Sequence, residues 1–429
     1  MLRPRRTPLT AALAASVLLL TAACGLGGDG GQPGPDAMAS GPVAPVPVVT
    51  PAGAADVTWG GEACRITGVT CAEHAGLPTV LLPAASGGSR AVVLVDFGGP
   101  GGSVEQALDR VGDLGLPADL GVLLVGEAWE VSPPPETCLE QEATRLAHWS
   151  SVATAACDPA PWTFDPSAYR DAIAGALAPA DATVAAAVGI SFGAVRVSAA
   201  TAPSVPLALL SPAPPSGTLS EVVGSRASAI SAAAVRACGA TPGCGPAVSR
   251  MGSAAVRDDA GYEAALALVG AAPSPEAFSA TALSLATPDA DSTRAALHRQ
   301  AFAATFRYGD GEVLPNLVSY RGGLCGWYAP GTAPVGAIGD VLSGVLGCPA
   351  ARGAAGATGS APSDLRDRTG CVFTAKDDLV TPPAFSRAWT AAAPGLQPAT
   401  ASLTSHGSTD GAVADVLGGL PDSLRSCTR

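Results

Sequence analysis

Short apolar segments alternate with helical patterns over most of the chain after residue 57. Five apolar runs have the length and composition of β-strands: residues 79–82, 91–97, 120–125, 183–188 and 205–210. The run at residues 91–97 (AVVLVDF) is apolar almost throughout, which is typical of a strand covered on both faces. Residues 104–114 and 169–178 have the pattern of helices. This alternation predicts an α/β fold with a mostly parallel sheet.

Residues 183–198 (TVAAAVGISFGAVRVS) predict a strand, a sharp turn and a helix. Ser191 lies at the centre of the turn, where the backbone is strained and the hydroxyl is exposed. Gly189 and Gly193 are needed because Cβ atoms there would collide with the neighbouring strand and helix. The helix that follows directs its free N–H groups toward Ser191, which suits a developing oxyanion. A chain with 52 glycines also produces G-x-S-x-G by chance, so further motifs must support this interpretation.

Residues 1–24 have the pattern of an export signal. Arginines precede an apolar run at residues 11–23, which is too short for a permanent membrane span. The run leads into Cys24 through small residues and resembles the lipobox of bacterial lipoproteins, in which the cysteine is acylated and becomes the new N-terminus. Thr21 stands where an aliphatic residue is most common, so an ordinary secretory signal cut near Ala23 is the alternative.

Residues 25–55 follow as a flexible tether, because a segment dominated by Gly, Pro, Ala and Asp cannot bury a core. The folded body is therefore expected on the outer face of a membrane, lipid-anchored, or free as a secreted protein. The net charge is −12 and Lys376 is the only lysine. Nothing in this composition offers a basic surface to phosphates, which excludes nucleic acid as a partner.

Cysteine usage also suits an exported chain. If Cys24 carries a lipid, ten cysteines remain, and an even number predicts up to five disulfides. Short loops favour three pairs, although the sequence does not settle the pairing: Cys64 with Cys71, Cys138 with Cys157, and Cys238 with Cys244. A metal site is the competing interpretation. It is disfavoured because the chain has no C-x-x-C motif and its four histidines are scattered.

A glycine-rich loop at residues 98–103 (GGPGGS) connects the strand at residues 91–97 to the next helical segment. Such a loop can hold a phosphate, but the chain has neither G-K-[ST] nor G-x-G-x-x-G here, which disfavours a nucleotide site. In a hydrolase, the same loop lets bare backbone N–H groups approach a substrate carbonyl.

Several motifs in chain order resemble the proline iminopeptidase and tripeptidyl aminopeptidase family of α/β-hydrolases. They are residues 97–103 (FGGPGGS), 189–193 (GISFG), 378–382 (DLVTP), 405–407 (SHG) and 418–421 (GGLP) with Cys427. The resemblance is to the secreted actinobacterial members that carry an extra C-terminal region, and it covers most of residues 57–429. Independently of the family, the order Ser, Asp, His is that of an α/β-hydrolase triad.

The resemblance implies that Ser191 is the nucleophile, His406 the base and Asp378 the acid that orients the base. His406 is the only histidine after Asp378, and its small neighbours suit a loop from which a base can reach the serine. Asp377 is a rival of Asp378, but the alignment of D-x-V-T-P favours Asp378. No metal and no organic cofactor is implied.

The resemblance also implies an oxyanion hole made by the backbone N–H groups of Gly99 and Phe192. One segment departs from the family pattern. After the strand that ends at Val125, family members have an acidic residue followed by R-G-x-G-x-S, whereas this chain has residues 127–133 (EAWEVSP). In the family that turn shapes the floor of the site, so the departure implies altered substrate choice or reduced activity.

Residues 212–367 form an insertion between the two parts of the hydrolase core, residues 56–211 and 368–429. It contains four alanine-rich helical segments: residues 219–235, 254–269, 277–285 and 293–306. The family places a helical lid here, which limits substrates to small or end-bound ones and excludes water. Five acidic residues are available to bind a free α-amino group, although each has a simpler interpretation as a solvated charge: Glu221, Asp258, Asp259, Glu263 and Glu312.

The sequence therefore predicts an exported serine hydrolase, an aminopeptidase that releases N-terminal residues or tripeptides through an acyl-enzyme. Its expected partners are a peptide substrate and, through the lipid, a membrane. One alternative is an esterase or lipase of the same fold, because ester hydrolysis needs no site for an amine. Another is a surface-binding lipoprotein that kept the fold without turnover, which the change at residues 127–133 suggests.

Overall fold

The computed structural model describes most of the chain after residue 57, in one compact unit. The described residues are 58–59, 62–63, 70–87, 89–147, 160–253, 259–285, 316–329, 331, 336–346, 348, 365–409 and 411–427. The predicted signal with Cys24, the predicted tether and the predicted helix at residues 293–306 lie outside them. No helix among the described residues has the length and apolar character that crossing a bilayer requires.

Eight strands form the central sheet, in the order β10-β9-β8-β7-β5-β6-β4-β3. They are β3 (Thr70–His74), β4 (Leu77–Leu82), β5 (Ala91–Asp96), β6 (Gly121–Val125), β7 (Thr183–Ile190), β8 (Leu207–Leu210), β9 (Gly370–Phe373) and β10 (Leu396–Pro398). Strands β5 to β10 are mutually parallel, and β4 is antiparallel to both of its neighbours. A separate short pair joins β1 (Thr58–Trp59) to β2 (Glu62–Ala63). The strand, turn and helix around Ser191 complete an α/β-hydrolase fold, which confirms the predicted fold class.

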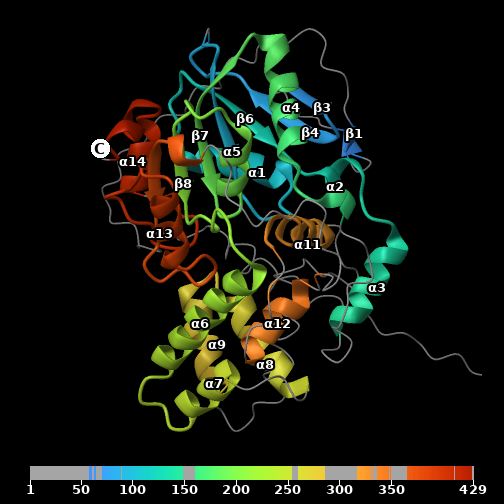
Figure 1. Cartoon of the computed structure of the whole chain (residues 1–429), viewed down its shortest axis with the longest axis vertical. Coiled ribbons are helices and arrows are strands. Elements are labelled where there is room, and N and C mark those ends of the chain that lie inside the picture. The colour runs from blue at the N-terminus through green and yellow to red at the C-terminus, as the bar shows by residue number, and fades with distance from the viewer. Residues whose placement is uncertain are drawn as a thin grey trace, which may run out of the picture. The chain divides into compact units, whose positions relative to one another are not determined.

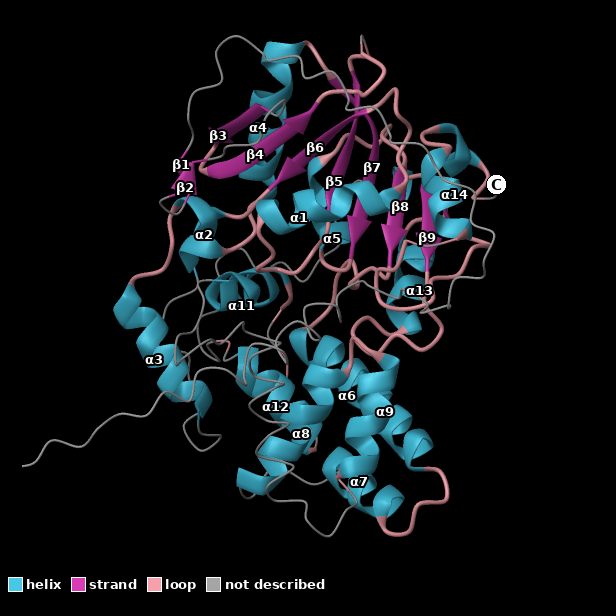
Figure 2. Cartoon of the chain, turned by 180° about the vertical axis from the view of Figure 1, so that it is seen from behind, coloured by secondary structure: helices cyan, strands magenta, loops and turns pink. Residues whose placement is uncertain are grey.

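Helices cover both faces of the sheet (Figures 1 and 2). They include α1 (Val104–Val111), α4 (Pro166–Leu177), α5 (Gly193–Ala200), α13 (Pro383–Ala392) and α14 (Ala412–Gly418). Alternate residues of β5 face opposite layers: Val92 and Leu94 pack with α4, α5 and α13, while Val93 and Val95 pack with α1 and α14. Burial on both faces explains why this strand is apolar almost throughout.

The segment between β8 and β9 is helical (Figure 1). Its described helices are α6 (Leu219–Cys238), α7 (Cys244–Ser253), α8 (Asp259–Ala271), α9 (Pro275–Ser284), α11 (Asn316–Trp327) and α12 (Ala337–Leu346). Helices α6, α8 and α9 correspond to predicted helices, although residues 254–258 of the predicted segment 254–269 lie outside the described residues. The pattern did not predict α7, α11 and α12. Helix α11 contains Gly322, Gly323 and Gly326, and glycine has a low helix propensity that only tertiary packing overcomes.

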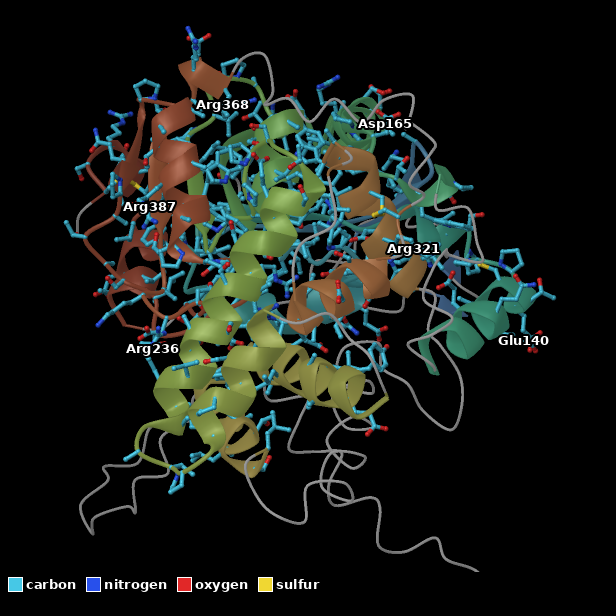
Figure 3. All side chains as sticks on the ribbon, turned by 60° about the horizontal axis from the view of Figure 1, so that its bottom comes forward. Glu140, Asp165, Arg236, Arg321, Arg368 and Arg387 are labelled. Carbon is cyan, nitrogen blue, oxygen red and sulfur yellow. A yellow bond between two sulfur atoms is a disulfide. The ribbon has the colours of Figure 1, made fainter. Side chains whose placement is uncertain are left out.

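Two short helices, α2 (Ala128–Val131) and α3 (Glu136–Ala147), follow β6. Helix α3 is joined to α11 by a fully buried ion pair, in which Arg321 Nη1 lies 2.9 Å from Glu142 Oε1. Figure 3 labels Arg321. The pair ties a helix of the insertion to the segment that follows the strand β6.

The C-terminal end of α5 is capped by a buried arginine. Arg368, which Figure 3 labels, lies just before β9 and donates hydrogen bonds to the backbone carbonyls of Ser198, Thr201 and Ala202. These carbonyls have no partner within the helix, and a cation there also interacts favourably with the helix dipole. The helix that follows Ser191 is thus fixed at its far end.

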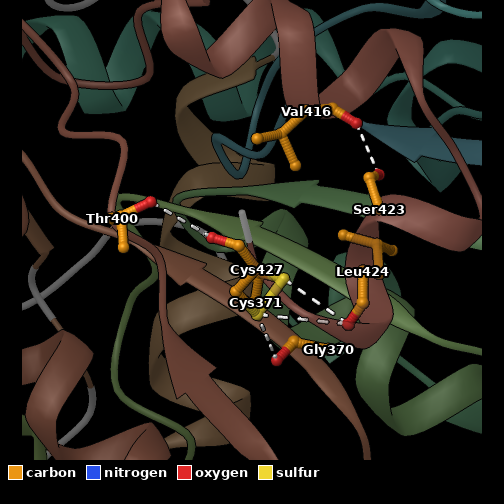
Figure 4. The surroundings of a disulfide bond; sticks show 7 residues. All are labelled: Gly370, Cys371, Thr400, Val416, Ser423, Leu424 and Cys427. Carbon is orange, nitrogen blue, oxygen red and sulfur yellow. Dashed lines mark hydrogen bonds between the residues drawn. A yellow bond between two sulfur atoms is a disulfide. The ribbon is translucent and has the colours of Figure 1, made fainter. Parts of the chain in front are cut away.

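Disulfides connect three described pairs of cysteines. Cys238 pairs with Cys244, as the sequence predicts, Cys325 pairs with Cys348, and Cys371 of β9 pairs with Cys427 at the C-terminal end (Figure 4). Cys71 and Cys138 are also disulfide-bonded. Their predicted partners, Cys64 and Cys157, lie outside the described residues.

The Cys371–Cys427 bond closes a loop of 56 residues and the Cys238–Cys244 bond a loop of 6. Replacing both members of the longer pair by alanine should lower the free energy of unfolding in urea by about 4 kcal/mol, and the shorter pair by about 2 kcal/mol, because a longer cross-linked loop removes more entropy from the unfolded chain. The shorter pair is a matched control, since all four sulfurs are buried. Equal losses for the two variants would contradict this account.

Candidate active site

The turn at residues 189–193 has a strained backbone. Ser191, between β7 and α5, has a φ of 55°, which lies in the left-handed region that residues other than glycine seldom adopt. Its backbone N–H donates to Leu210 O at 3.0 Å, and its carbonyl accepts from Ala213 N at 2.9 Å. These bonds to the neighbouring strand and the loop beyond it hold the conformation, which places the Ser191 side chain at the end of the sheet.

Glycines on both sides of Ser191 are required by space. A Cβ at Gly189 would lie 2.6 Å from Ala194 Cα, and a Cβ at Gly193 would lie 2.3 Å from Asp96 O. A Cβ at Gly98 would lie 2.2 Å from Ile190 O, so the glycine-rich loop approaches the turn as closely as backbone can. The predicted reason for the glycines is confirmed, and it extends to the loop after β5.

Asp378 and His406 are joined by a hydrogen bond of 2.9 Å between Oδ2 and Nδ1. Asp378 Oδ1 also accepts from the backbone N–H groups of Val380 and Thr381 at 2.9 and 2.8 Å. Burial alone would raise the pKa of Asp378, but the charge and hydrogen bond of His406 and the bond from Thr381 N outweigh it and lower the pKa. The carboxylate therefore stays ionised beside the imidazole. Its rival Asp377 is exposed.

Two hydroxyl groups support this pair. Thr381 Oγ1 lies 2.9 Å from Asp378 Oδ2 and 3.1 Å from His406 Nδ1, and it donates to Ser211 O at 2.8 Å. Ser211 Oγ accepts from Gly407 N at 3.3 Å and also hydrogen-bonds Asp378. Ser211 and Thr381 thus connect the loops that carry the acid and the base. The T of the D-L-V-T-P motif could have indicated Thr381, whereas Ser211 has no sequence signal beyond following a predicted strand.

The loop that carries His406 packs against the turn that carries Ser191. A Cβ at Gly407 would lie 2.7 Å from Ile190 Cγ2, so the residue after the histidine touches the residue before the serine. Within the described part of the chain, the imidazole hydrogen-bonds through Nδ1, and no hydrogen bond joins it to Ser191. The ring's other nitrogen, Nε2, is therefore the one available for proton transfer with a neighbouring hydroxyl.

Some backbone N–H groups of the glycine-rich loop donate hydrogen bonds within the protein, and others are left free to bind a ligand. Gly98 N donates to Asp96 Oδ1 at 2.8 Å, and Gly101 N donates to both oxygens of Glu127 at 2.9 Å. Among the described hydrogen bonds, none uses the N–H of Gly99 or of Phe192, the two groups that the sequence resemblance implied for an oxyanion. Phe192 is also the N-cap residue of α5.

A buried charge cluster lies behind these donors. Arg196 of α5 pairs with Asp96 at 3.3 Å and with Glu127, and Tyr169 donates to Asp96 Oδ2 at 2.8 Å. Burial lowers the pKa of Arg196, but the charges of Glu127 and Asp96 outweigh it and raise the pKa. Burial, reinforced by the charge of Asp96, raises the pKa of the Tyr169 hydroxyl. Paired charges at this depth persist only because they are hydrogen-bonded.

Residues 127–133, which depart from the family pattern, supply carboxylates to the glycine-rich loop. Glu130 Oε2 accepts from Val104 N and Glu130 Oε1 from Glu127 N, each at 2.8 Å. Burial is the main cause that raises the pKa of Glu130 to about 8, against the hydrogen bonds that lower it. Two buried glutamates therefore anchor the loop and the first turn of α1, in a segment where the family has Arg and Gly.

The lid carboxylates that the sequence offered for an amine are only partly described. Glu221 is exposed and accepts from the N–H and the hydroxyl of Thr218, which makes it part of the cap of α6. These bonds lower its pKa. Glu263 is half-buried on α8. The side chains of Asp258, Asp259 and Glu312 lie outside the described residues.

The glycine-rich loop and four of the polar residues follow the carboxyl ends of parallel strands. Residues 98–103 follow β5, Glu127 follows β6, Ser191 follows β7, Ser211 follows β8 and Asp378 follows β9. Parallel strands bring their carboxyl ends to one edge of the sheet, which is where open α/β sheets bind ligands. The arrangement can support nucleophilic catalysis by a serine, since a hydroxyl, an imidazole oriented by a carboxylate and free N–H donors lie at one edge.

Comparison with known proteins finds no family model and no curated protein that matches the chain. Among solved structures, the chain is similar to a serine hydrolase, CCSP0084, from Cycloclasticus zankles (13% identity, 77% of this chain and 88% of that chain, TM-score 0.34). It is also similar to an alpha/beta hydrolase fold protein from Nakamurella multipartita (12%, 83% and 99%, TM-score 0.36). A third is an acetylester hydrolase from Corynebacterium glutamicum (15%, 75% and 82%, TM-score 0.37). The fold assignment itself rests on the strand order and the turn at Ser191.

Replacing Glu130 by glutamine should change how stability depends on pH. The folded protein keeps the Glu130 proton up to about pH 8, whereas the unfolded chain releases it near 4.5, so wild-type stability falls as pH rises between these values. Relative to the variant, the wild-type free energy of unfolding should fall by up to about 4 kcal/mol between pH 5 and 9. Urea unfolding at several pH values measures this, with the exposed Glu105→Gln as control. Parallel curves for wild type and Glu130→Gln would contradict it.

Proposed function

We propose that the protein is a serine hydrolase in which Ser191, His406 and Asp378 form the catalytic triad. The observation that carries this proposal is the hydrogen bond between Asp378 Oδ2 and His406 Nδ1, together with the packing of the His406 loop against the strained turn of Ser191. The bond fixes the proton of the imidazole on Nδ1 and leaves Nε2 as the base.

In the first half of the reaction, Ser191 Oγ attacks the carbonyl carbon of the substrate while His406 Nε2 removes the hydroxyl proton. The ionised Asp378 stabilises the imidazolium that forms, which agrees with its lowered pKa. The tetrahedral intermediate then collapses, and His406 returns the proton to the leaving group. An acyl-enzyme on Ser191 Oγ remains.

In the second half, water attacks the acyl-enzyme and His406 again acts first as base and then as acid, so Ser191 is regenerated. The negative oxygen of both intermediates accepts hydrogen bonds from the N–H groups of Gly99 and Phe192. Their lack of acceptors in the described structure supports this role, because preorganised donors stabilise charge that develops in the transition state.

For the substrate we propose peptides with a free N-terminus. The sequence motifs resemble aminopeptidases of this fold, and a helical insertion between β8 and β9 suits a site that admits chain ends. An ester hydrolase is the second candidate. The capping role of Glu221 favours it, because that carboxylate is already used by Thr218 and an ester needs no partner for an amine.

We also propose that the protein is exported and anchored to the outer face of a membrane through a lipid on Cys24, or is secreted. The export pattern of residues 1–24 supports the first step. The disulfides support an oxidising compartment, where such bonds form and persist.

Wild-type protein should form a covalent adduct with a fluorophosphonate probe, and Ser191→Ala should form none. Asp378→Asn should lower kcat on a short acyl ester by about 10⁴-fold, because the imidazole loses its orienting charge. Asp377→Asn is the matched control and should keep wild-type activity, since that carboxylate is exposed. A wild type without adduct, measured by in-gel fluorescence or intact mass, would remove catalysis and leave only the fold.

A substrate panel separates the two candidate activities. Aminoacyl and tripeptidyl amides with a free α-amino group should be hydrolysed with a kcat/KM at least about 10-fold higher than their N-acetylated counterparts. An acetylated substrate would leave the group that binds the α-amine buried and unpaired, which costs at least that much. Short acyl esters serve as the comparison. Equal rates on acetylated substrates, or activity on esters alone, would assign the protein to the esterases.

A further inference from the structure

We infer that Glu127 is a positioning residue that holds the two oxyanion donors at a fixed separation. The inference rests on the proposed hydrolase function and adds a residue to which the sequence analysis assigned no role. Glu127 is 7% exposed, and its two oxygens bond three different parts of the chain.

The glycine-rich loop has little stiffness of its own. Gly98, Gly99 and Gly101 all have positive φ values, of 78°, 121° and 96°. Glycine adopts these conformations because it has no Cβ, and for the same reason it restricts the backbone little. A loop rich in glycine therefore needs contacts with other residues to hold one conformation. Gly101 N provides that restraint by donating to both carboxylate oxygens of Glu127 at 2.9 Å.

Glu127 is tied at the same time to the helix that carries the other donor. Its Oε1 pairs with Arg196 Nη2, and Arg196 lies one helical turn after Phe192. The backbone N–H of Arg196 donates to Phe192 O at 3.2 Å, so the two residues move as one turn of helix. A single carboxylate therefore lies between the loop of Gly99 and the helix start of Phe192.

Helix α11 completes the support from the insertion. Ser319 Oγ donates to Glu127 Oε2. One turn along, a Cβ at Gly323 would lie 2.3 Å from Pro100 Cγ and 3.6 Å from Phe192 Cε1, so the bare helix backbone rests against both donor segments. The connection joins residues that are 192 positions apart in the chain.

Loss of the Glu127 charge should therefore affect the chemical step more than substrate binding. Removal of a whole oxyanion donor costs about 10²–10³-fold in kcat, and a displaced donor retains part of its effect. Glu127→Gln should lower kcat on a short acyl ester by about 10- to 100-fold with KM changed by less than about 3-fold, since the interaction is made only in the transition state. The rate of fluorophosphonate labelling should fall in parallel.

The experiment compares Glu127→Gln with Glu142→Gln in the full-length protein. Glu142 is also buried and pairs with Arg321 of the same helix α11, whereas Glu127 bonds Ser319 of that helix. Both variants lose a buried ion pair and should lower Tm, but only Glu127→Gln should lower kcat. Each rate is divided by the concentration of active sites, which is the amount of fluorophosphonate adduct after the labelling reaction has gone to completion.

If Glu127→Gln has a lowered Tm but the same kcat and labelling rate as the wild type, the inference is overturned and the proposed function stays intact. A wild type that never reacts with the probe would overturn both. If Glu127→Gln does not fold, Ser319→Ala and Gly323→Ala test the same link from α11. Each should lower kcat by about 3- to 10-fold at constant KM, since small displacements at a catalytic site carry such costs. Unchanged kcat in both would also overturn the inference.

Discussion

The backbone at Ser191 keeps its left-handed conformation because the chain around it leaves no room to relax. Such a conformation costs about 1–3 kcal/mol and persists only where the surroundings over-determine it. Here Leu210 O and Ala213 N bond the backbone of Ser191 on one side, and Asp96 O and Ile190 O lie where any Cβ at Gly193 or Gly98 would have to go. The capped far end of α5 removes a further way for the helix to shift.

Because the glycine-rich loop packs so closely against the turn, its backbone N–H groups need buried acceptors, and buried carboxylates provide them. A loop that must be glycine to approach the turn at Ser191 cannot hold its own shape, and its amides need acceptors. Asp96, Glu127 and Glu130 supply carboxylate oxygens to Gly98, Gly101 and Val104. One arginine, Arg196, balances two of these charges, and the raised pKa of Glu130 lets the third carry a proton near neutral pH. Buried charge here gives position rather than stability.

The helices of the insertion are of two kinds: most pack on one another, and one packs against the candidate active site. Helices α6, α8, α9 and α12 pack mainly on one another. Helix α11 instead brings Gly323 against Pro100 and Phe192, and a disulfide from Cys325 restrains it. A helix poor in propensity is thus kept by tertiary bonds because its bare backbone is what fits against the site.

Local pattern in the sequence was enough to determine the strands β4 to β8, the turn at Ser191 and the need for Gly189 and Gly193, because each depends on neighbouring residues. It did not indicate β3, β9 and β10, and the choice of Asp378 over Asp377 came from the resemblance to a family motif. Tertiary structure alone decided that Ser211 and Thr381 support Asp378 and His406, and that Glu127 and Glu130 replace the expected turn. It also decided that α11 forms and where it lies. Those contacts join residues up to 196 positions apart. Partners at such separations are chosen by strand order and burial, which hydrophobic periodicity along the chain does not encode.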